Sequence, residues 1–334
     1  MTERTHDPVA RYTLTRTESA TVGDIADRFL AAHQTWDPLR DADEVRAWSE
    51  ELPVGVRKFL AAGRTGEDPI ISVSNLPLSE ELVPTPPGWE IAEKEGAAIR
   101  EEVVLLLLAS VLGDPFGWAN QQNGRLVHDV CPAKGKENSL TSASSKAQLA
   151  LHTEDVFHAC RGDYVALLCL RNPDRVGTTV AGLDVLTLPE EVRKVLEQNR
   201  FRFFPDDSHE TAPQYAGGQL VARGEREHET ASVLFGPSDA PYLRMDEDFT
   251  SPLPGDLEAE AAMRQCAEQL AGSAERVVLS PGEAVFLDNY QVVHGRDLFT
   301  PRYDGTDRWL KRTSMVRDLR RTYVHTGSRS RILG

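Results

Sequence analysis

The chain has 334 residues, of which 27% are charged and 40% hydrophobic, and its formal net charge is −15. This length suits one large domain or two modest ones with a sizeable core. The negative charge disfavours a nucleic acid or an anionic membrane as a partner. No apolar run approaches the ~18 residues that cross a bilayer, and the N-terminus has no signal-peptide core. The four cysteines form no CxxC pair, so we expect unpaired thiols and a reducing, cytoplasmic location.

The first third of the chain is predicted to be mainly helical. Helical spacing of apolar residues marks residues 17–33, 41–50, 53–63 and 93–112, and Thr21 is a candidate N-cap of the first helix. The β-branched residues of 69–76 predict a strand, and the prolines between 82 and 89 predict a loop. This part of the chain carries little chemistry of its own.

From residue 117 onward, short apolar segments alternate with turns. The expected strands are residues 126–130, 149–152, 164–170, 178–185, 232–235, 242–245, 276–279, 284–289 and 313–318. Two expected helices, 189–199 and 258–271, interrupt them. Many short strands indicate a sandwich or barrel. We therefore predict an α+β fold in one domain, 1–334. Its jelly-roll core, a double-stranded β-helix, spans 113–334, and the helices of 1–112 pack outside it.

A histidine and a glutamate lie two residues apart in L-A-L-H-T-E-D-V-F-H, residues 149–158. If this stretch is a strand, alternation places His152 and Glu154 on one face, about 7 Å apart along the chain. His294, in the distant segment V-V-H-G, is the best candidate for a third ligand. Two histidines and one carboxylate that leave positions open on the metal form the facial triad of non-haem Fe(II) oxygenases.

The alternative is that the His-x-Glu pair is only a buried polar pair. Asp155 is a rival carboxylate, but strand alternation turns it to the opposite face. The rival imidazoles are His128, His158 and His209. His158 lies six residues beyond His152, which is too far for both to share one ion.

An arginine-rich segment, residues 302–321, follows the third candidate ligand. Such a run is usually a solvated or acid-paired face. However, Arg308 and Arg312 lie beside Trp309 and Leu310, and a half-buried guanidinium binds a carboxylate through two parallel hydrogen bonds. Next to a metal with open positions, this clamp indicates a 2-oxoacid cosubstrate that chelates the iron.

Several acidic and amide side chains have no obvious partner. Asp206 lies in F-F-P-D-D-S-H, and Asp246 and Asp248 lie in M-D-E-D-F, where they would share one face of a strand. Surface turns explain them simply, whereas the functional interpretation is a cationic substrate, because the five donors of a guanidinium suit two or three carboxylates. Gln121, in A-N-Q-Q-N-G, binds an α-amino group or caps a turn, and Ser142 lies in a serine-rich loop that is a lid or a linker.

The chain resembles the clavaminate-synthase-like branch of Fe(II)/2-oxoglutarate-dependent oxygenases, and within it the bacterial hydroxylases of free amino acids. The resemblance runs from about residue 113 to near the C-terminus, and its motifs are jointly far more specific than H-x-E alone. They are G-D-P-F-G-W-A-N-Q-Q-N-G-R (113–125), H-T-E-D-V-F-H (152–158), P-D-D-S-H (205–209), D-x-D-F (246–249) and P-R-Y-D-G-T-D-R-W-L-K-R (301–312).

The resemblance implies which residues bind the iron and its cosubstrate. Arg308 would bind the distal carboxylate of 2-oxoglutarate, with the hydroxyl of Thr179 or Thr178 as its partner. The implied iron ligands are His152, Glu154 and His294.

The resemblance also implies a substrate pocket. Arg312 would bind the α-carboxylate of the substrate, and Gln121 with Glu154 would approach its α-amino group. Ser142 would lie in a loop that closes over the site, and a lid insert would span about 208–232. The residues that would hold a guanidinium are Asp206, Asp246 and Asp248.

The implied activity is hydroxylation of free L-arginine at C3, with Fe(II), 2-oxoglutarate and O2. Desaturation of a C–C bond, double hydroxylation, and a cyclic substrate such as enduracididine remain alternatives. A non-catalytic, cupin-like amino-acid-binding protein and a zinc hydrolase with the same three ligands are more distant ones. The oligomeric state and the pathway stay open, although the resembling enzymes serve peptide-antibiotic biosynthesis.

Overall fold

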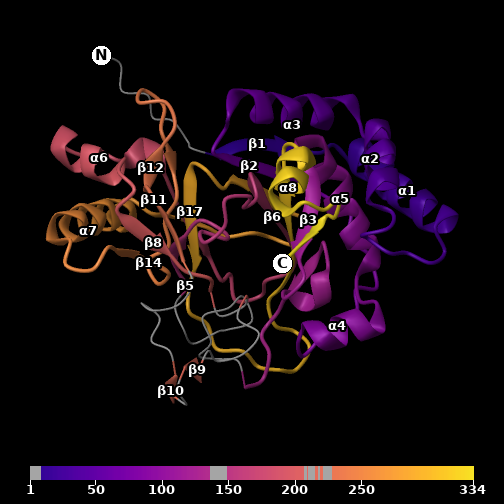
Figure 1. Cartoon of the computed structure of the whole chain (residues 1–334). Helices are drawn as coiled ribbons and strands as arrows, with labels where there is room; N and C mark the ends of the chain where they lie inside the picture. The colour runs from indigo at the N-terminus through magenta and orange to yellow at the C-terminus, as the bar shows by residue number, and fades with distance from the viewer. Residues whose placement is uncertain (1–8, 136–148, 207–208, 210–214, 217–218, 221–227) are drawn as a thin grey trace.

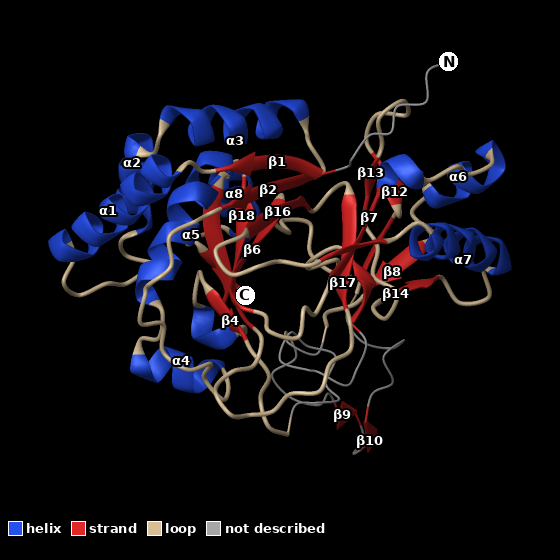
Figure 2. Ribbon diagram, turned by 180° about the vertical axis from the view of Figure 1, so that it is seen from behind, coloured by secondary structure: helices blue, strands red, loops and turns tan. Residues whose placement is uncertain are grey.

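The computed structural model describes residues 9–135, 149–206, 209, 215–216, 219–220 and 228–334. Two β-sheets face each other in the middle of the molecule (Figures 1 and 2). The N-terminal helices cover the outer side of the larger sheet, and α6 (Glu190–Leu196) and α7 (Leu257–Gly272) lie at the other end. The expected serine-rich loop and most of the expected lid insert fall outside the described residues. None of the described helices is long and apolar enough to cross a membrane.

The predicted N-terminal helices are present, with two corrections. The first helix begins after Thr15, not at Thr21. The Thr15 hydroxyl accepts from the Glu18 backbone N–H, and the Glu18 carboxylate accepts from the Thr15 N–H at 2.9 Å, which is a complete capping box. The helices are α1 (Arg16–Ala32), α2 (Ala42–Trp48), α3 (Val54–Gly66), α4 (Trp89–Glu95) and α5 (Ile99–Leu112).

The single helix expected over 93–112 is two helices, α4 and α5. The break lies at Gly96 and Ala98, whose φ angles of 60° and 58° put both residues in the left-handed region. After its charged first turn, helix α5 is apolar on all sides, and it is almost wholly buried because it lies between the other N-terminal helices and the larger sheet.

The larger sheet has the strand order β1-β2-β16-β6-β18-β3-β19, and β4 pairs with β18 beside β3. Two of its strands, β1 and β2, come from the N-terminal part of the chain. Strand β1 pairs with β2, and β2 pairs with β16. Residues 1–112 therefore also contribute strands to the central sheet. The strands are β1 (Val9–Thr13), β2 (Ile70–Ser74), β3 (Asp114–Trp118), β4 (His128–Val130), β6 (Tyr164–Arg171), β16 (Ala284–Asp288), β18 (Trp309–Val316) and β19 (Ile332–Leu333).

The smaller sheet has the order β15-β7-β17-β5 and is antiparallel throughout. Val180 and Val292 on its inner face join an apolar cluster with residues of the larger sheet, whereas Ala181 and Val293 on its outer face pack toward α6 and α7. Its strands are β5 (Leu149–His152), β7 (Thr178–Gly182), β15 (Glu275–Val277) and β17 (Val292–Arg296).

Short strands and one more helix complete the described fold. A three-stranded sheet lies against α7, and its order is β11-β8-β14. The expected strands 232–235 and 242–245 are reduced to two-residue strands, and the elements that were not predicted include β3, β8, β11, β14, β19 and α8. The remaining elements are β8 (Phe201–Phe203), β9 (Tyr215–Ala216), β10 (Gln219–Leu220), β11 (Glu229–Ala231), β12 (Leu234–Phe235), β13 (Tyr242–Leu243), β14 (Thr250–Pro252) and α8 (Leu319–Thr326).

Candidate active site

The three candidate iron ligands meet on the inner side of the smaller sheet. His152 ends β5 and lies directly opposite His294 of β17, with ring centroids 4.4 Å apart. Oε1 of Glu154 lies 3.2 Å from Nε2 of His294 and 3.9 Å from Nε2 of His152. One ligand atom from each residue falls within 4.8 Å of the others. This donor set of two imidazole nitrogens and one carboxylate oxygen fits a divalent metal ion.

Glu154 reaches this position through a loop, because β5 already ends at His152. Asn289 holds the loop on both sides of the residue. Its Oδ1 accepts from the Glu154 N–H at 2.6 Å, and its Nδ2 donates to the Glu154 carbonyl at 3.1 Å. Asn289 is buried, and nothing in the local sequence pattern pointed to it.

The charge states of Glu154 and His294 also suit a cation. Burial opposes ionisation of Glu154, but Arg312 and the two histidines hold its pKa well below the usual value. Burial, together with His152, lowers the pKa of His294. The Nδ1–H of His152 can donate to the Ala150 carbonyl at 2.8 Å, which leaves Nε2 with a free lone pair for a metal.

Two buried guanidinium groups, of Arg296 and Arg308, lie near each other, and Arg296 belongs to the same strand as His294. Alternation along β18 places Leu310 and Arg312 on the inner side of the larger sheet, with Leu310 in the inter-sheet cluster, and Arg308 directly precedes this strand. Burial lowers the pKa of Arg308 to about 10, and its Nε has no hydrogen-bond partner among the described residues. Burial and the neighbouring Arg308 lower the pKa of Arg296 to about 10. Such a pair attracts an anion, and a carboxylate fits the guanidinium fork.

Strand register distinguishes the two candidate threonines. Thr178 lies opposite Arg296, and Val180 lies opposite His294, so Thr178 shares the inner face with these residues. Thr179 lies opposite Gly295 on the outer face. Arg296 was missed in the sequence, although its spacing of two residues from His294 in a strand was a usable signal.

Arg312 connects the carboxylate ligand to the amide of Gln121. Its Nη1 lies 3.2 Å from Oε2 of Glu154, and its Nη2 donates to Oε1 of Gln121 at 3.3 Å. The same Nη2 lies 2.9 Å from Nδ1 of His128. Burial and the two nearby arginines, Arg312 and Arg125, hold the pKa of His128 well below its usual value. His128 therefore supports Arg312 as a neutral acceptor, away from the three ligands.

Asp155 turns away from the ligands and holds a buried polar network. Its φ of 54° directs the carboxylate toward Trp118, whose Nε1 donates to Oδ2 at 2.8 Å. Oδ1 lies 3.0 Å from Nε2 of His209. The same nitrogen lies 2.8 Å from Nε2 of Gln121. His209 thus belongs to the support of Gln121, a role that the sequence did not indicate.

Two of the three predicted aspartates, Asp206 and Asp246, lie near His152. Asp246 forms a backbone bridge with His152, and the charges of Asp206 and Asp246 both act on that imidazole. We expected Asp246 and Asp248 to share one face of a strand. They lie in a turn instead. Oδ1 of Asp246 accepts from the N–H groups of Asp248 and Phe249 at 2.8 and 2.9 Å. Ser142 lies outside the described residues.

Comparison with known proteins identifies the class. Residues 101–314 match the family model described as "Taurine catabolism dioxygenase TauD, TfdA family". The chain belongs to this family, and it is an Fe(II)- and 2-oxoglutarate-dependent dioxygenase.

Individual relatives cover 80% or more of the chain. Enduracididine beta-hydroxylase of Streptomyces hygroscopicus is 37% identical over 91% of this chain and 93% of its own length. L-ornithine/L-arginine 3-hydroxylase of Catenulispora acidiphila is 36% identical over 80% of this chain and 83% of its own. The solved structure of the non-heme iron oxygenase OrfP with Fe, succinate and (3S)-hydroxy-L-Arg has a TM-score of 0.87 and 35% identity, and it covers 97% of this chain and 99% of that one.

When bound, iron with 2-oxoglutarate and O2 supplies the oxidising power that inserts oxygen into a C–H bond. The chain supplies position and charge. His152, Glu154 and His294 would hold the metal from one side, and Arg308 would hold the carboxylate that extends away from it. Because small displacements change the rate or the site of attack steeply, the support from Asn289 and His209 bears directly on the reaction.

Proposed function

We propose that this protein hydroxylates an unactivated C–H bond of a free guanidino amino acid, with L-arginine at C3 as the preferred substrate. One observation carries this proposal: the candidate metal site lies between groups of opposite charge. Asp206 and Asp246 lie on the His152 side, and Arg312 lies on the Glu154 side. An amino acid with a cationic side chain and an α-carboxylate is complementary to this arrangement.

The substrate would lie across the site from one charged group to the other. Arg312 would bind the α-carboxylate, and Gln121 with Glu154 would receive the α-amino group, since Arg312 already contacts both side chains. Asp206, Asp246 and Asp248 would surround the guanidinium. The carbons between these two ends would then face the metal. Desaturation, double hydroxylation and a cyclic substrate such as enduracididine remain the alternatives within this pocket.

The cosubstrate would occupy the space beside Arg308. We infer that its distal carboxylate binds Arg308 with the hydroxyl of Thr178, because Thr178 and not Thr179 shares the inner face with His294. Arg296 adds a second buried positive charge there. In the same proposal the two facing sheets are the halves of a double-stranded β-helix, and 1–334 forms one domain. Four buried, unpaired cysteines favour a reducing, cytoplasmic location.

Relatives of similar identity act on different amino acids. L-asparagine oxygenase of Streptomyces coelicolor is also 37% identical, over 98% of this chain. Overall identity therefore does not select the substrate, and the side chains around the site must. A neutral asparagine amide would leave the buried Asp246 without a cationic partner, and an uncompensated buried charge is costly. The aspartates thus favour a guanidino substrate.

The test is a product assay with the purified full-length chain. The protein is incubated with Fe(II), ascorbate, O2 and 2-oxoglutarate, and with L-arginine, enduracididine or L-asparagine, and product mass and succinate are measured. We expect a gain of one oxygen on L-arginine, coupled to succinate, and no turnover by His152→Ala. A loss of two hydrogens would assign a desaturase. Coupled turnover of L-asparagine alone would contradict the guanidino pocket.

A further inference from the structure

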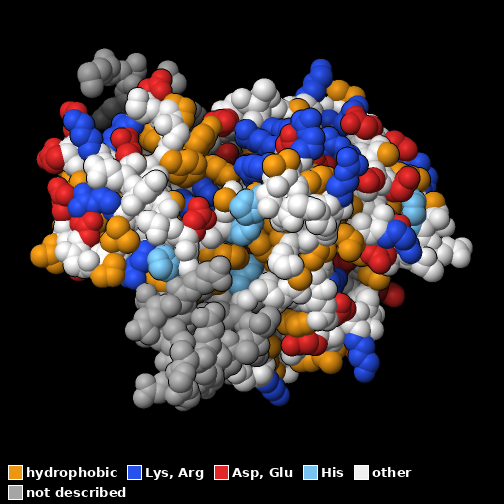
Figure 3. Space-filling view, in the orientation of Figure 1, with side chains coloured by type: hydrophobic (Ala, Val, Ile, Leu, Met, Phe, Trp, Pro, Cys, Tyr) orange, Lys and Arg blue, Asp and Glu red, His pale blue; other side chains and the backbone are white. Residues whose placement is uncertain are grey.

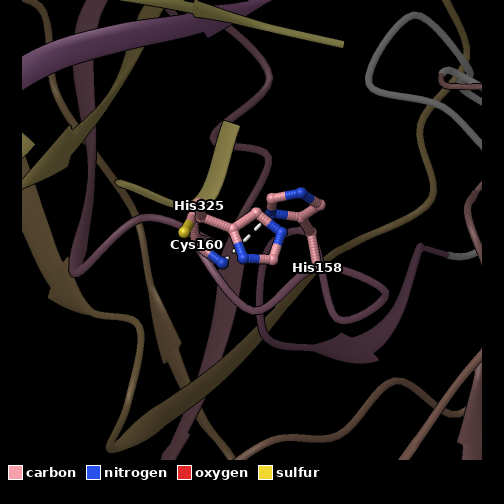
Figure 4. A group of neighbouring side chains, drawn as sticks. All are labelled: His158, Cys160 and His325. Carbon is pink, nitrogen blue, oxygen red and sulfur yellow. Dashed lines mark hydrogen bonds between the residues drawn. The ribbon is translucent and has the colours of Figure 1, made fainter. Parts of the chain in front are cut away.

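A second group of metal-binding side chains lies outside the active site. His158 and Cys160 follow Glu154 in the same loop, and His325 comes from α8 at the end of the chain. One ligand atom from each lies within 4.8 Å of the others. Figure 4 shows the three side chains together, with the rings of His158 and His325 next to each other. The iron site uses none of them.

These side chains have few other interactions. Cys160 Sγ makes one long contact, 3.8 Å to the Arg321 carbonyl, and the side chain of His325 makes no hydrogen bond within the described part of the chain. The rings of His158 and His325 are 4.9 Å apart and nearly perpendicular. Cys160 is buried, whereas His325 is exposed, so the group extends from the surface to the thiol.

We propose that His158, Cys160 and His325 form a second metal site, which binds zinc or a similar borderline-soft ion. Two imidazoles and one thiolate are typical zinc ligands, and three protein ligands leave a fourth position for water. A tetrahedral zinc separates its nitrogen and sulfur ligands by about 3.5 Å. The three ligand atoms would therefore draw together by about 1 Å, and the exposed end of α8 allows His325 to move.

Binding of the metal ion releases one proton and breaks one hydrogen bond. Burial raises the pKa of the Cys160 thiol, so the ion must displace the thiol proton, which passes to the buffer. Nδ1 of His158 accepts from the Cys160 N–H at 3.0 Å, the bond drawn in Figure 4. A neutral imidazole offers one lone pair, so coordination by His158 replaces this hydrogen bond. An occupied site would fasten α8 to the loop that carries Glu154.

Cobalt(II) tests the proposal, because a thiolate ligand gives it a charge-transfer absorption in the near ultraviolet. The iron ligands contain no sulfur, so the two sites give different spectra. The full-length chain is freed of metal with a chelator and titrated with Co(II). We expect two bound equivalents and a sulfur-to-cobalt band, which Zn(II) then removes by displacing the cobalt.

Variants assign the band to its residues. Cys160→Ser should bind one equivalent without the band, and His152→Ala should bind one equivalent with the band intact. His325→Ala, at an exposed position that does not endanger folding, should weaken the cobalt affinity of this site by at least about tenfold. Cys266→Ser, a buried thiol far from the group, is the matched control and should keep the band.

A single equivalent without a band in the unmodified chain would overturn the proposal. So would a band that survives Cys160→Ser, or a cobalt affinity that His325→Ala leaves unchanged. Because the readout is absorption and stoichiometry, it does not depend on which amino acid the enzyme oxidises.

Discussion

The guanidinium of Arg308 is buried, and its Nε has no hydrogen-bond partner among the described residues. Lysine in its place keeps the charge but loses the planar fork that binds a carboxylate through two bonds. We expect Arg308→Lys to raise the KM for 2-oxoglutarate roughly thirtyfold, which corresponds to about 2 kcal/mol. The rate of succinate formation, measured at a series of 2-oxoglutarate concentrations, gives this KM.

Arg302→Lys is the matched control, because Arg302 pairs with Asp174 at the surface and should tolerate the change. An unchanged KM in Arg308→Lys would remove Arg308 from the cosubstrate pocket.

A substitution at Asp246 tests the substrate pocket by changing a single atom of the side chain. Its Oδ1 accepts two backbone N–H groups, and asparagine can keep these bonds while losing the charge. We expect Asp246→Asn to raise the KM for L-arginine about tenfold or more, because one charge-assisted contact to the guanidinium is lost. The variant should also lose its preference for L-arginine over citrulline, the neutral analogue of the same shape.

Steady-state kinetics with both amino acids measure this effect. Glu247→Gln, an exposed neighbour, should behave like the unmodified enzyme. If the Asp246→Asn variant still discriminates fully against citrulline, other groups recognise the guanidinium.

The loop after β5 is the element that organises this region. Within a few residues it directs Glu154 to His294, Asp155 to His209, and His158 to α8. The divergence is possible because the loop has left the strand, and the left-handed conformation of Asp155 redirects the chain. Asn289 and the network of His209 then hold the loop from two sides.

His209 is a positioning residue in this element. It lies between Asp155 and Gln121, so His209→Ala should free the Gln121 amide. We expect the KM for the amino acid to rise about tenfold, while the KM for 2-oxoglutarate stays the same, because Gln121 lies away from Arg308. His209→Gln, which keeps a hydrogen-bonding group, should recover part of the loss. Equal changes in both KM values would indicate general damage to the fold instead.

At the scale of the whole molecule, charge is unevenly distributed. Figure 3 shows Lys and Arg side chains gathered on the upper part of one face, although the net charge is −15. The core also contains charges: Nζ of Lys311, fully buried, lies 2.9 Å from Oε1 of Glu102 and 2.7 Å from Oδ1 of Asp129. These contacts connect α5 to the larger sheet through β18 and β4.

Removing the buried cation should destabilise the protein strongly. Lys311→Met leaves Glu102 and Asp129 with less positive charge in a buried site, and we expect a loss of about 3 kcal/mol in the free energy of unfolding. Urea denaturation measures it. Lys194→Met, at an exposed pair with Glu190, should change stability by no more than about 0.5 kcal/mol. If both variants lose equally little stability, the buried charges around Lys311 do not stabilise the fold in the way proposed.

Asp288 makes stability depend on pH. Burial raises its pKa from 3.8 to about 6, so between these values the folded chain holds a proton that the unfolded chain has lost. The free energy of unfolding therefore falls as the pH rises through this window. Above about pH 6 the carboxylate is ionised in the folded chain, and its full destabilising effect is present. Asp288→Asn should be more stable than the unmodified chain at pH 7, by about 3 kcal/mol.

Urea denaturation at pH 4 and pH 7 separates this effect from others. The advantage of Asp288→Asn should nearly vanish at pH 4, where the carboxyl is protonated in the folded state. A gain that is the same at both values would mean that ionisation of Asp288 is not its cause.

The sequence by itself determined the family, the main helices and the candidate ligands. These features depend on local patterns, such as helical spacing from 17 to 33 and the pair His152 and Glu154, or on motifs whose residues can be matched one by one. Such signals survive without coordinates because each is contained in a short stretch of chain.

The tertiary structure decided what depends on contacts between distant segments. Pairing between β7 and β17 places Thr178 on the inner face and Thr179 on the outer face, and Arg296 of β17 comes near Arg308, the residue before β18, only through the packing of the two sheets. The meeting of His158 with His325 depends in the same way on where α8 packs. Register and packing are set by the burial of whole faces, and no local pattern contains that information.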